Sequence, residues 1–444
     1  MKIEQFKDAP LAHYSYAVIS EGKMALVDPS RNPLQYYRHA EANNAEIVAV
    51  FETHPHADFV SGHKQIQEQT GAKVYTSKLT GATYEHLTFD QGDELQMGKV
   101  SFRAINTPGH SPDSITIVAE AEGKIVLFTG DTLFVGDVGR PDLREKVGNM
   151  TAQRISLAKD MYRTIRNGFS GLPDQAVVYP AHGAGSLCGK NMSSESATTL
   201  GNERKYNWAF RNMPEPEFVE TILKDQPFIP HYFGFDVELN RVGGENVQRT
   251  KASVPLLINP ASLTPGIPVV DSRDEKTFKK GHFPGSINIM ARHERDKFET
   301  WLGAIVEPEE SFYLVVAGVD QVRELLERTA KIGYEKQIEA ILIPGTGARE
   351  VTPVLDLKKF AANQEHFTIV DIRNEPEVNQ KMIFRNSLHI PLFALRDRLE
   401  EIPTDKPIVV HCAGGYRSAA GSSIIQDKYA EIDVFDLSED IRKF

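Results

Sequence analysis

Short apolar runs, each ended abruptly by polar residues, recur along the first half of the chain. These runs are residues 47–51, 101–105, 125–128 and 176–179. Each has the length and the boundaries of a buried β-strand. Residues 14–20 and 24–27 form two more runs around Glu21-Gly22-Lys23, and their spacing predicts a hairpin. Further strands are predicted at 71–75, 89–95 and 115–118, and helices at 34–43 and 151–167.

The second half of the chain contains an internal repeat. Residues 269–273 (VVDSR) match residues 369–373 (IVDIR), and residues 286–289 match residues 387–390. Strand-like runs at 312–317 and 407–411 each precede a helix-like stretch. Because strands alternate with helices at this pace, the pattern predicts two small parallel α/β domains.

Length and charge narrow the possible functions. A chain of 444 residues is too long for one core and suggests about three domains. Its hydrophobic fraction of 41% and charged fraction of 25% are ordinary for a globular protein. A net charge of -11 argues against binding to nucleic acid or to anionic membranes, and no apolar run approaches the length of a membrane span. With Cys188 and Cys412 as its only cysteines and a charged N-terminus, the chain is expected to be cytoplasmic.

Histidine and carboxylate side chains follow the predicted strands of the first half. His54, His56 and Asp58 come directly after residues 47–51. The later strands lead to His110, Asp131 and His182. Imidazoles and carboxylates are common metal ligands, and four strand ends at one edge of an α/β fold bring them together. The cluster predicts a metal site rather than solvated loop histidines, but spacing alone leaves open which three of the six residues hold the ion.

The order H-x-H-x-D, then His, Asp and His, resembles the metallo-β-lactamase fold family over the first half of the chain. One departure changes the expected chemistry: Phe59 stands where the two-metal hydrolases of that family have a histidine. A phenyl ring cannot bind a metal, whereas a zinc hydrolase of the glyoxalase II type uses two ions. Two histidines and one carboxylate with open positions opposite are typical of non-haem Fe(II) oxygenases.

Together with residues 136–142 (GDVGRPD), the motif H-P-H-A-D-F resembles the persulfide dioxygenase branch of the fold. The resemblance implies one Fe(II) per chain, held by His54, His110 and Asp131. It leaves His56, Asp58 and His182 to orient these ligands or water, or to act as alternative ligands. Arg140 would face an anionic part of the substrate, with a surface arginine as the alternative.

Two more residues of the first half are candidates for the site. Cys188 lies in a glycine-rich loop shortly after His182, and Lys190 is expected to lower the pKa of its thiol. Such a thiol would hold or relay a persulfide at the mouth of the iron pocket, and an inert buried cysteine is the alternative. His13 is either structural or part of the pocket wall.

Both copies of the repeat resemble the rhodanese fold, in which D-x-R follows the first strand. In the last copy, Cys412, Gly415 and Arg417 match the C-x-x-G-x-R loop of that family. Backbone N–H groups, a helix N-terminus and Arg417 would hold a thiolate or a persulfide on Cys412. The substrate-binding candidates of this loop are Gly414, Gly415, Tyr416 and Ser418. The middle copy has no cysteine and is expected to be a scaffold, spacer or docking surface.

The predicted fold class is α/β, with an N-terminal metallo-β-lactamase αββα sandwich followed by two rhodanese-like domains. The expected domains are 1–245 for the persulfide dioxygenase, 252–347 for the rhodanese-like domain without cysteine, and 350–444 for the catalytic rhodanese. A linker is expected over 243–251.

As a whole, the chain resembles the persulfide dioxygenase–rhodanese fusions of bacterial sulfide detoxification. That resemblance implies a persulfide of coenzyme A, glutathione or bacillithiol, O2, and sulfite or thiosulfate as small-molecule partners. We also expect a homo-oligomer. Two other functions compete: a dinuclear zinc thioester hydrolase of the glyoxalase II type fused to rhodanese domains, and a persulfide carrier or sensor with a structural metal site.

Overall fold

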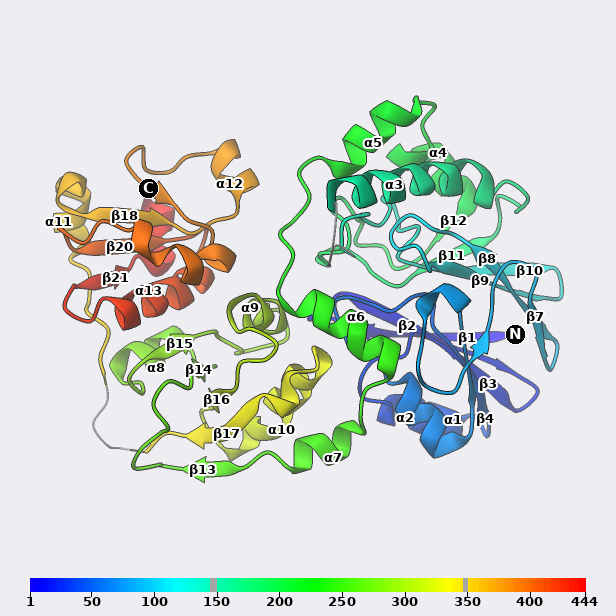
Figure 1. The fold of residues 1–444 in the computed structure, drawn as a ribbon, viewed down its shortest axis with the longest axis horizontal. Coiled ribbons are helices and arrows are strands. Elements are labelled where there is room, and N and C mark those ends of the chain that lie inside the picture. Colours follow the sequence, from blue (N-terminus) through cyan, green and yellow to red (C-terminus); the bar gives the residue numbers. More distant parts are fainter. Residues whose placement is uncertain (144–149, 346–349) are drawn as a thin grey trace. The chain divides into compact units, whose positions relative to one another are not determined.

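The computed structural model describes residues 1–143, 150–345 and 350–444, which divide into two compact units (Figure 1). The first unit comprises Met1–Arg249 with Ala330–Gly333, and the second comprises Thr250–Thr329 with Tyr334–Phe444. None of the helices in these described ranges has the length and apolar character that a bilayer crossing demands.

Two six-stranded sheets form the first unit. The first sheet has the order β1 (Lys2–Asp8), β2 (His13–Ser20), β3 (Lys23–Val27), β4 (Glu46–Phe51), β5 (Lys73–Thr76) and β6 (Leu87–Thr88). The second has the order β12 (Thr198–Thr199), β11 (Val177–Pro180), β10 (Lys124–Gly130), β9 (Ile115–Ala121), β8 (Val100–Asn106) and β7 (Glu94–Met97). Strands β2 and β3 pair antiparallel, which confirms the predicted hairpin, and β4 and β11 lie parallel to β3 and β10.

Alternating side chains explain why these sheets stack. In β3, Ala25 and Val27 join the core between the sheets, whereas Met24 and Leu26 face the outer helices. In β10, Phe128 joins the same inner core and Leu127 packs on the opposite face. Both faces of each sheet are therefore covered, which gives the four layers of the predicted αββα sandwich.

Helices cover the outer face of each sheet. The first sheet carries α1 (Leu34–Ala42) and α2 (His63–Thr70), and the second carries α3 (Met150–Arg163), α4 (Leu200–Tyr206) and α5 (Glu215–Leu223) (Figure 1). The unit also contains a π-helical turn at Thr164–Gly168, α6 (Tyr232–Val242) and the first half of α7 (Val247–Ala252). The single strand predicted at 89–95 is wrong, because Asp90 and Asp93 form a turn and Gly92 has a φ of +96°.

The second unit contains two wholly parallel sheets, as the repeat predicted. One has the order β13 (Leu256–Ile258), β17 (Ile338–Ile343), β16 (Phe312–Val315), β14 (Val269–Asp271) and β15 (Ser286–Asn288). The other has the order β19 (Leu388–His389), β18 (Thr368–Asp371), β20 (Ile408–His411) and β21 (Val434–Asp436). Their helices are α8 (Glu275–Lys280), α9 (Phe298–Ile305), α10 (Val319–Lys331), α11 (Leu357–Ala362), α12 (Glu375–Gln380) and α13 (Tyr416–Lys428).

The repeated D-x-R sequence has the same structural role in both copies. Arg273 binds Asp271 at 2.6 Å and donates to the carbonyl of Gly281 just after α8. Arg373 binds Asp371 at 2.6 Å and donates to the carbonyl of Lys381 just after α12. In each copy the arginine ties the end of the first strand to the end of the following helix.

The junctions between the predicted domains differ in part from expectation. The boundary between the two units, at Arg249 and Thr250, falls within the predicted linker, although Val247–Ala252 form helix α7. We keep 1–245, 252–347 and 350–444 as proposed domain ranges, and the end at 347 lies outside the described residues.

Candidate metal centre and sulfur-transfer site

Three buried side chains converge at the ends of strands in the first unit. His54 follows β4, His110 follows β8, and Asp131 follows β10. The Nε2 atoms of His54 and His110 lie 3.8 Å and 3.6 Å from Asp131 Oδ2, and the three ligand atoms form one compact group. Within the described residues, Asp131 Oδ2 accepts no hydrogen bond. A buried carboxylate oxygen facing two imidazole nitrogens is a site suited to a divalent cation.

The other ring nitrogens of the two histidines are held by the protein. His54 Nδ1 lies 3.1 Å from Thr53 Oγ1, and His110 Nδ1 donates to the carbonyl oxygen of Arg140 at 2.8 Å. These contacts fix the orientation of each ring and leave Nε2 directed at the carboxylate. Burial opposes ionisation of Asp131, but the imidazoles of His182, His110 and His54 outweigh it and hold the pKa of Asp131 well below its usual range.

His182 stands between two carboxylates. Its Nδ1 donates to Asp131 Oδ1 at 2.7 Å, and its Nε2 lies 2.9 Å from Asp58 Oδ2. Burial disfavours the imidazolium, but Asp131 and Asp58 raise the pKa of His182 well above its usual value. This arrangement leaves one oxygen of Asp131 for a metal and commits the other to His182.

Two other combinations of the sequence candidates also lie close enough to bind an ion. His56, Asp131 and His182 form one group, and Asp58, His182 and Cys188 form another. The structure thus brings together all six histidine and carboxylate candidates, together with Cys188.

The ring of Phe59 forms an apolar wall on the side of His56. Its centroid lies 4.5 Å from that of His56, 3.9 Å from that of His13 and 6.3 Å from that of His182, and the phenyl group is buried. Burial, followed by His182 and His56, lowers the pKa of His13 well below its usual value. His13 is therefore a neutral ring in the wall beside Phe59.

The loop with Cys188 differs from expectation. Lys190 Nζ donates to the carbonyls of Thr221 and Lys224 at 2.8 Å and 2.6 Å, so its charge is directed away from the thiol. Burial and the carboxylates of Asp58 and Asp131 raise the pKa of Cys188 well above its ordinary value. The prediction that Lys190 lowers this pKa is wrong, because the nearby charges are negative.

Arg140 is buried, so the alternative of a surface arginine is wrong. Its guanidinium makes a two-point ion pair with Asp142 at 2.6 Å and 2.7 Å. Its Nη1 donates to Leu187 O and its backbone N–H donates to Cys188 O. Arg140 thereby clamps the loop that carries Cys188, and its expected contact with substrate stays a prediction.

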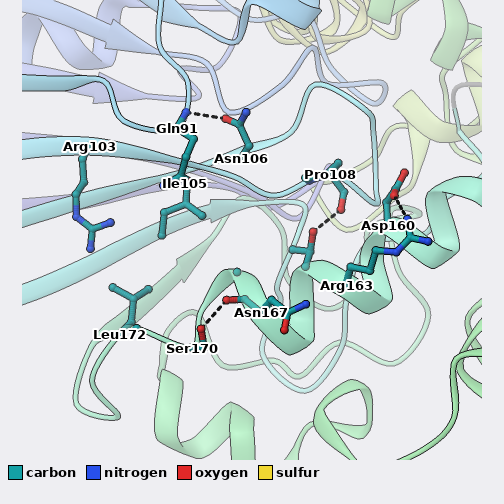
Figure 2. Close-up of a pocket in the computed structure, with 13 residues that line it drawn as sticks. Gln91, Arg103, Ile105, Asn106, Pro108, Asp160, Arg163, Asn167, Ser170 and Leu172 are labelled. Carbon is teal, nitrogen blue, oxygen red and sulfur yellow. Dashed lines mark hydrogen bonds and ion pairs between the residues drawn. The ribbon is translucent and has the colours of Figure 1, made fainter.

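The segment that leads to His110 is supported from its outer side. Thr164, in the π-helical turn, donates to the carbonyl of Pro108 at 2.7 Å (Figure 2). Gly109 has a φ of +150°, and a Cβ at this position would lie 2.6 Å from the Cα of Met161. Figure 2 shows residues that line a neighbouring cavity, with Pro108 among them. The cavity has a volume of about 600 Å³, and none of the predicted site residues lines it.

In the second unit, Cys412 follows β20 and precedes helix α13. Gly415 has a φ of +101°, a backbone conformation that favours glycine, and its N–H donates to Cys412 Sγ at 3.1 Å. Ser418 Oγ donates to Gly415 O, while the Cα of Gly414 has open space on its Cβ side up to Arg442. One backbone N–H of the loop and the start of α13 thus lie at the thiol, and the binding of substrate by Gly414, Gly415, Tyr416 and Ser418 stays a prediction.

Arg417 is fixed by a two-point ion pair. Its Nη1 and Nη2 lie 2.6 Å and 2.7 Å from the carboxylate oxygens of Glu377 on α12. Burial disfavours the guanidinium charge, but Glu377 and then Cys412 outweigh this and raise the pKa of Arg417. A permanent positive charge is therefore available beside the thiol.

The domain without cysteine contributes to this site, which the sequence did not indicate. Tyr416 donates its hydroxyl to the carbonyl of Met290 at 2.7 Å. The Arg417 guanidinium lies 6.0 Å from the ring centroid of Trp301 on α9. In the corresponding loop of this domain, which follows β16, the N–H of Ala317 donates to the side chain of Gln321.

Comparison with known proteins agrees with this architecture. Residues 8–182 match the metallo-beta-lactamase superfamily, and residues 258–341 and 355–444 match the rhodanese-like domain. A crystal structure described as a metallo-beta-lactamase from Staphylococcus aureus is 30% identical, with a TM-score of 0.69, and the match covers 78% of this chain and 99% of that one.

Two curated relatives have different activities. The cytoplasmic hydroxyacylglutathione hydrolase of Arabidopsis thaliana is 30% identical over 232 residues, which is 49% of this chain and 83% of the relative. The human mitochondrial persulfide dioxygenase is 29% identical over 137 residues, which is 31% of this chain and 49% of the relative. The chain thus spans about half the length of the second relative. It is an enzyme of the metallo-β-lactamase superfamily that carries rhodanese-like domains.

Proposed function

We propose that this enzyme is a non-haem Fe(II) persulfide dioxygenase coupled to a sulfurtransferase. The observation that carries the proposal is the pairing of the His54, His110 and Asp131 cluster with the buried Phe59 ring. The ring stands where the two-metal hydrolases of the superfamily have a further imidazole. The similarity of the chain to the human persulfide dioxygenase supports the same proposal.

The donor set suits Fe(II) held at one position. Two neutral imidazole nitrogens and one carboxylate oxygen leave coordination positions open for other ligands. When bound there, Fe(II) would supply the redox chemistry that joins O2 to sulfur. His182 would keep Asp131 bound through a single oxygen, because it already holds the other. His56 and Asp58 would help to orient the centre.

The overall reaction balances with one added water. A persulfide RSSH, O2 and H2O give the thiol RSH and sulfurous acid, so the terminal sulfur is oxidised and O2 is reduced. The substrate would be a low-molecular-weight persulfide of the coenzyme A, glutathione or bacillithiol type. The apolar face of Phe59 would exclude water from one side of the sulfur chain.

Cys412 would perform the second half of the chemistry. Its thiolate would take the terminal sulfur from another persulfide and release RSH. Sulfite would then accept that sulfur from the Cys412 persulfide, giving thiosulfate and the free thiolate. The Gly415 N–H and Arg417 would stabilise the anionic sulfur during both transfers, which the N–H bond to Cys412 Sγ supports.

The proposal is tested by separating the two activities. The protein is reconstituted anaerobically with Fe(II), its metal content is measured, and O2 uptake is followed with several persulfides. His110→Ala is expected to abolish O2 uptake and to leave thiosulfate sulfurtransferase activity. Cys412→Ser is expected to do the reverse and to shift the product from thiosulfate to sulfite. Loss of both activities in His110→Ala, or an unchanged product ratio in Cys412→Ser, would contradict the coupled scheme.

A thioester hydrolase of the glyoxalase II type is the second candidate. It is favoured by the 30% identity with the Arabidopsis hydrolase and by the group of His56, Asp131 and His182. This alternative requires two zinc ions and cleavage of S-D-lactoylglutathione without O2 uptake. Measuring both reactions on the same preparation distinguishes the two candidates.

A further inference from the structure

Asn240 binds three backbone groups of the loop that carries the metal-ligand motif. It lies on α6, and its Nδ2 donates to the carbonyl oxygens of His56 and Phe59 at 2.8 Å each. Its Oδ1 accepts the N–H of Ser61 at 2.7 Å. The side chain is 2% exposed, so water does not compete for these bonds. One carboxamide therefore binds the loop on both sides of Phe59.

Few other side chains could bind these three backbone groups as Asn240 does. Residues 52–62 form no helix or strand, so the loop depends on contacts from outside itself for its shape. Both donor hydrogens and the acceptor of Asn240 are engaged, and no other uncharged side chain of similar size offers this combination except glutamine. The contact therefore contributes to the loop conformation, together with the bonds from Val60 N–H to Lys331 O and from Thr53 N–H to Asp28 Oδ1.

The loop conformation places two functional side chains. His54 precedes the bound carbonyl of His56 by two residues, and the ring of Phe59 emerges from the residue whose carbonyl Asn240 holds. A change in this turn moves Phe59 relative to His56 and His13, against which its ring packs. It also moves His54 relative to Asp131.

We infer that Asn240 is a positioning residue for the metal centre. It holds the turn at 56–61 so that His54 faces Asp131 and the Phe59 ring closes the neighbouring metal position. This inference rests on the proposed function only for the identity of the metal site. Asn240 lies outside residues 8–182, the part that matches the superfamily, so the role is carried by a distant segment of the chain.

Metal binding by Asn240→Ala tests the inference without any turnover. Co(II) is titrated into the apo protein, and its d–d absorption reports affinity and ligand geometry. Loss of a residue that orients metal ligands is expected to weaken binding by roughly 10- to 100-fold. The absorption spectrum is expected to change as well, because His54 and Phe59 are displaced. An unchanged affinity together with an unchanged spectrum would overturn the inference.

Asn288→Ala is the matched control. Asn288 is also buried, and its Nδ2 donates to the carbonyls of Asp271 and Arg273 at 3.0 Å and 2.9 Å in the second unit. This variant loses the same kind of carboxamide contact and is expected to bind Co(II) as the wild type does. If Asn288→Ala weakens Co(II) binding as much as Asn240→Ala, the effect is general destabilisation and the inference is wrong.

Asn240→Asp covers the case in which the alanine variant does not fold. It retains an acceptor for the Ser61 N–H but offers no donor to His56 or Phe59. Weaker binding and an altered Co(II) spectrum are expected, and wild-type behaviour would refute the role. Co(II) binding requires neither O2 nor persulfide. A wild type that lacks dioxygenase activity would therefore refute the proposed function without affecting the test of Asn240.

Discussion

Replacing Phe59 by histidine is expected to complete the second metal position that the two-metal hydrolases of the superfamily use. The new imidazole would stand beside His56 and near His182, because the phenyl centroid lies 4.5 Å and 6.3 Å from those rings. Asp58 already lies 2.9 Å from His182 Nε2. The variant would thus have the complete H-x-H-x-D-H motif on an otherwise unchanged scaffold.

The cost of this change follows from the burial of the ring. Burying a phenylalanine side chain stabilises a fold by about 1.5–3 kcal/mol, part of which histidine retains. A buried ring nitrogen without a partner costs roughly 1–3 kcal/mol. The apo variant is therefore expected to lose about 2–4 kcal/mol of unfolding free energy. A second ion, present at 100 times its Kd, is expected to raise the unfolding free energy of the variant by about 2.7 kcal/mol. For a domain of this size, this corresponds to a rise in Tm of about 5–10 °C.

Metal content and thermal unfolding check this expectation. Wild type is expected to bind one ion of zinc per chain and Phe59→His two, with the larger metal-dependent rise in Tm in the variant. Phe59→Leu is the control, since it changes the ring without supplying a ligand. A single ion in Phe59→His, with no added stabilisation over Phe59→Leu, would refute the argument that this ring decides the number of metals.

The second unit and the two thiols offer three further predictions. Burial opposes ionisation of Glu377, but Arg417 outweighs it and lowers the pKa of Glu377. The ion pair therefore stabilises the fold at pH values above the ordinary pKa of a glutamate. This stabilisation is lost as the pH falls through the lowered pKa. The difference in Tm between wild type and Glu377→Gln should therefore disappear in acid, and a constant difference would contradict this. Trp301→Ala should lower sulfurtransferase kcat/KM about 2- to 5-fold without changing O2 uptake, because a ring beside a guanidinium contributes about 0.5–1 kcal/mol. Trp301→Phe should restore most of the lost activity. Iodoacetamide should label Cys412 before Cys188, as mass spectrometry of the labelled peptides would test.

The cluster of candidate metal ligands could be predicted because a local sequence signal precedes each of its residues. Each of His54, His110, Asp131 and His182 follows an apolar run, and such runs become neighbouring strands whose ends share one edge of the fold. The loop at Cys412 was predictable for a similar reason, since its glycine and arginine lie within five residues of the thiol. In both cases the chemistry is encoded by short spacing next to a recognisable strand.

Residues that act across long separations gave no such signal. Asn240 contacts a loop about 180 residues earlier in the chain, and an asparagine near the end of a helix is usually read as a capping residue. Trp301 is one apolar position among several on α9, where the simplest expectation is core packing. Only the tertiary structure separates these side chains from their neighbours.

The two cysteines illustrate why sequence neighbours are a weak guide to electrostatics. Lys190 lies two residues from Cys188, yet it is directed at the backbone carbonyls of Thr221 and Lys224, while the carboxylates of Asp58 and Asp131 act on the thiol from distant segments. A thiol surrounded by negative charge resists ionisation, and it makes a poor nucleophile at neutral pH.

The groups near the Cys412 thiol are an N–H donor and a cation rather than carboxylates. They are neighbours of Cys412 in the sequence as well as in space. Its sulfur accepts the N–H of Gly415, and the Arg417 guanidinium is held nearby by Glu377. The tight loop gives these groups little freedom to point elsewhere, because the turn at Gly415 and the start of α13 fix their directions. A motif therefore predicts chemistry reliably when the backbone geometry that joins its residues is itself specified, and an isolated charged neighbour such as Lys190 lacks that constraint.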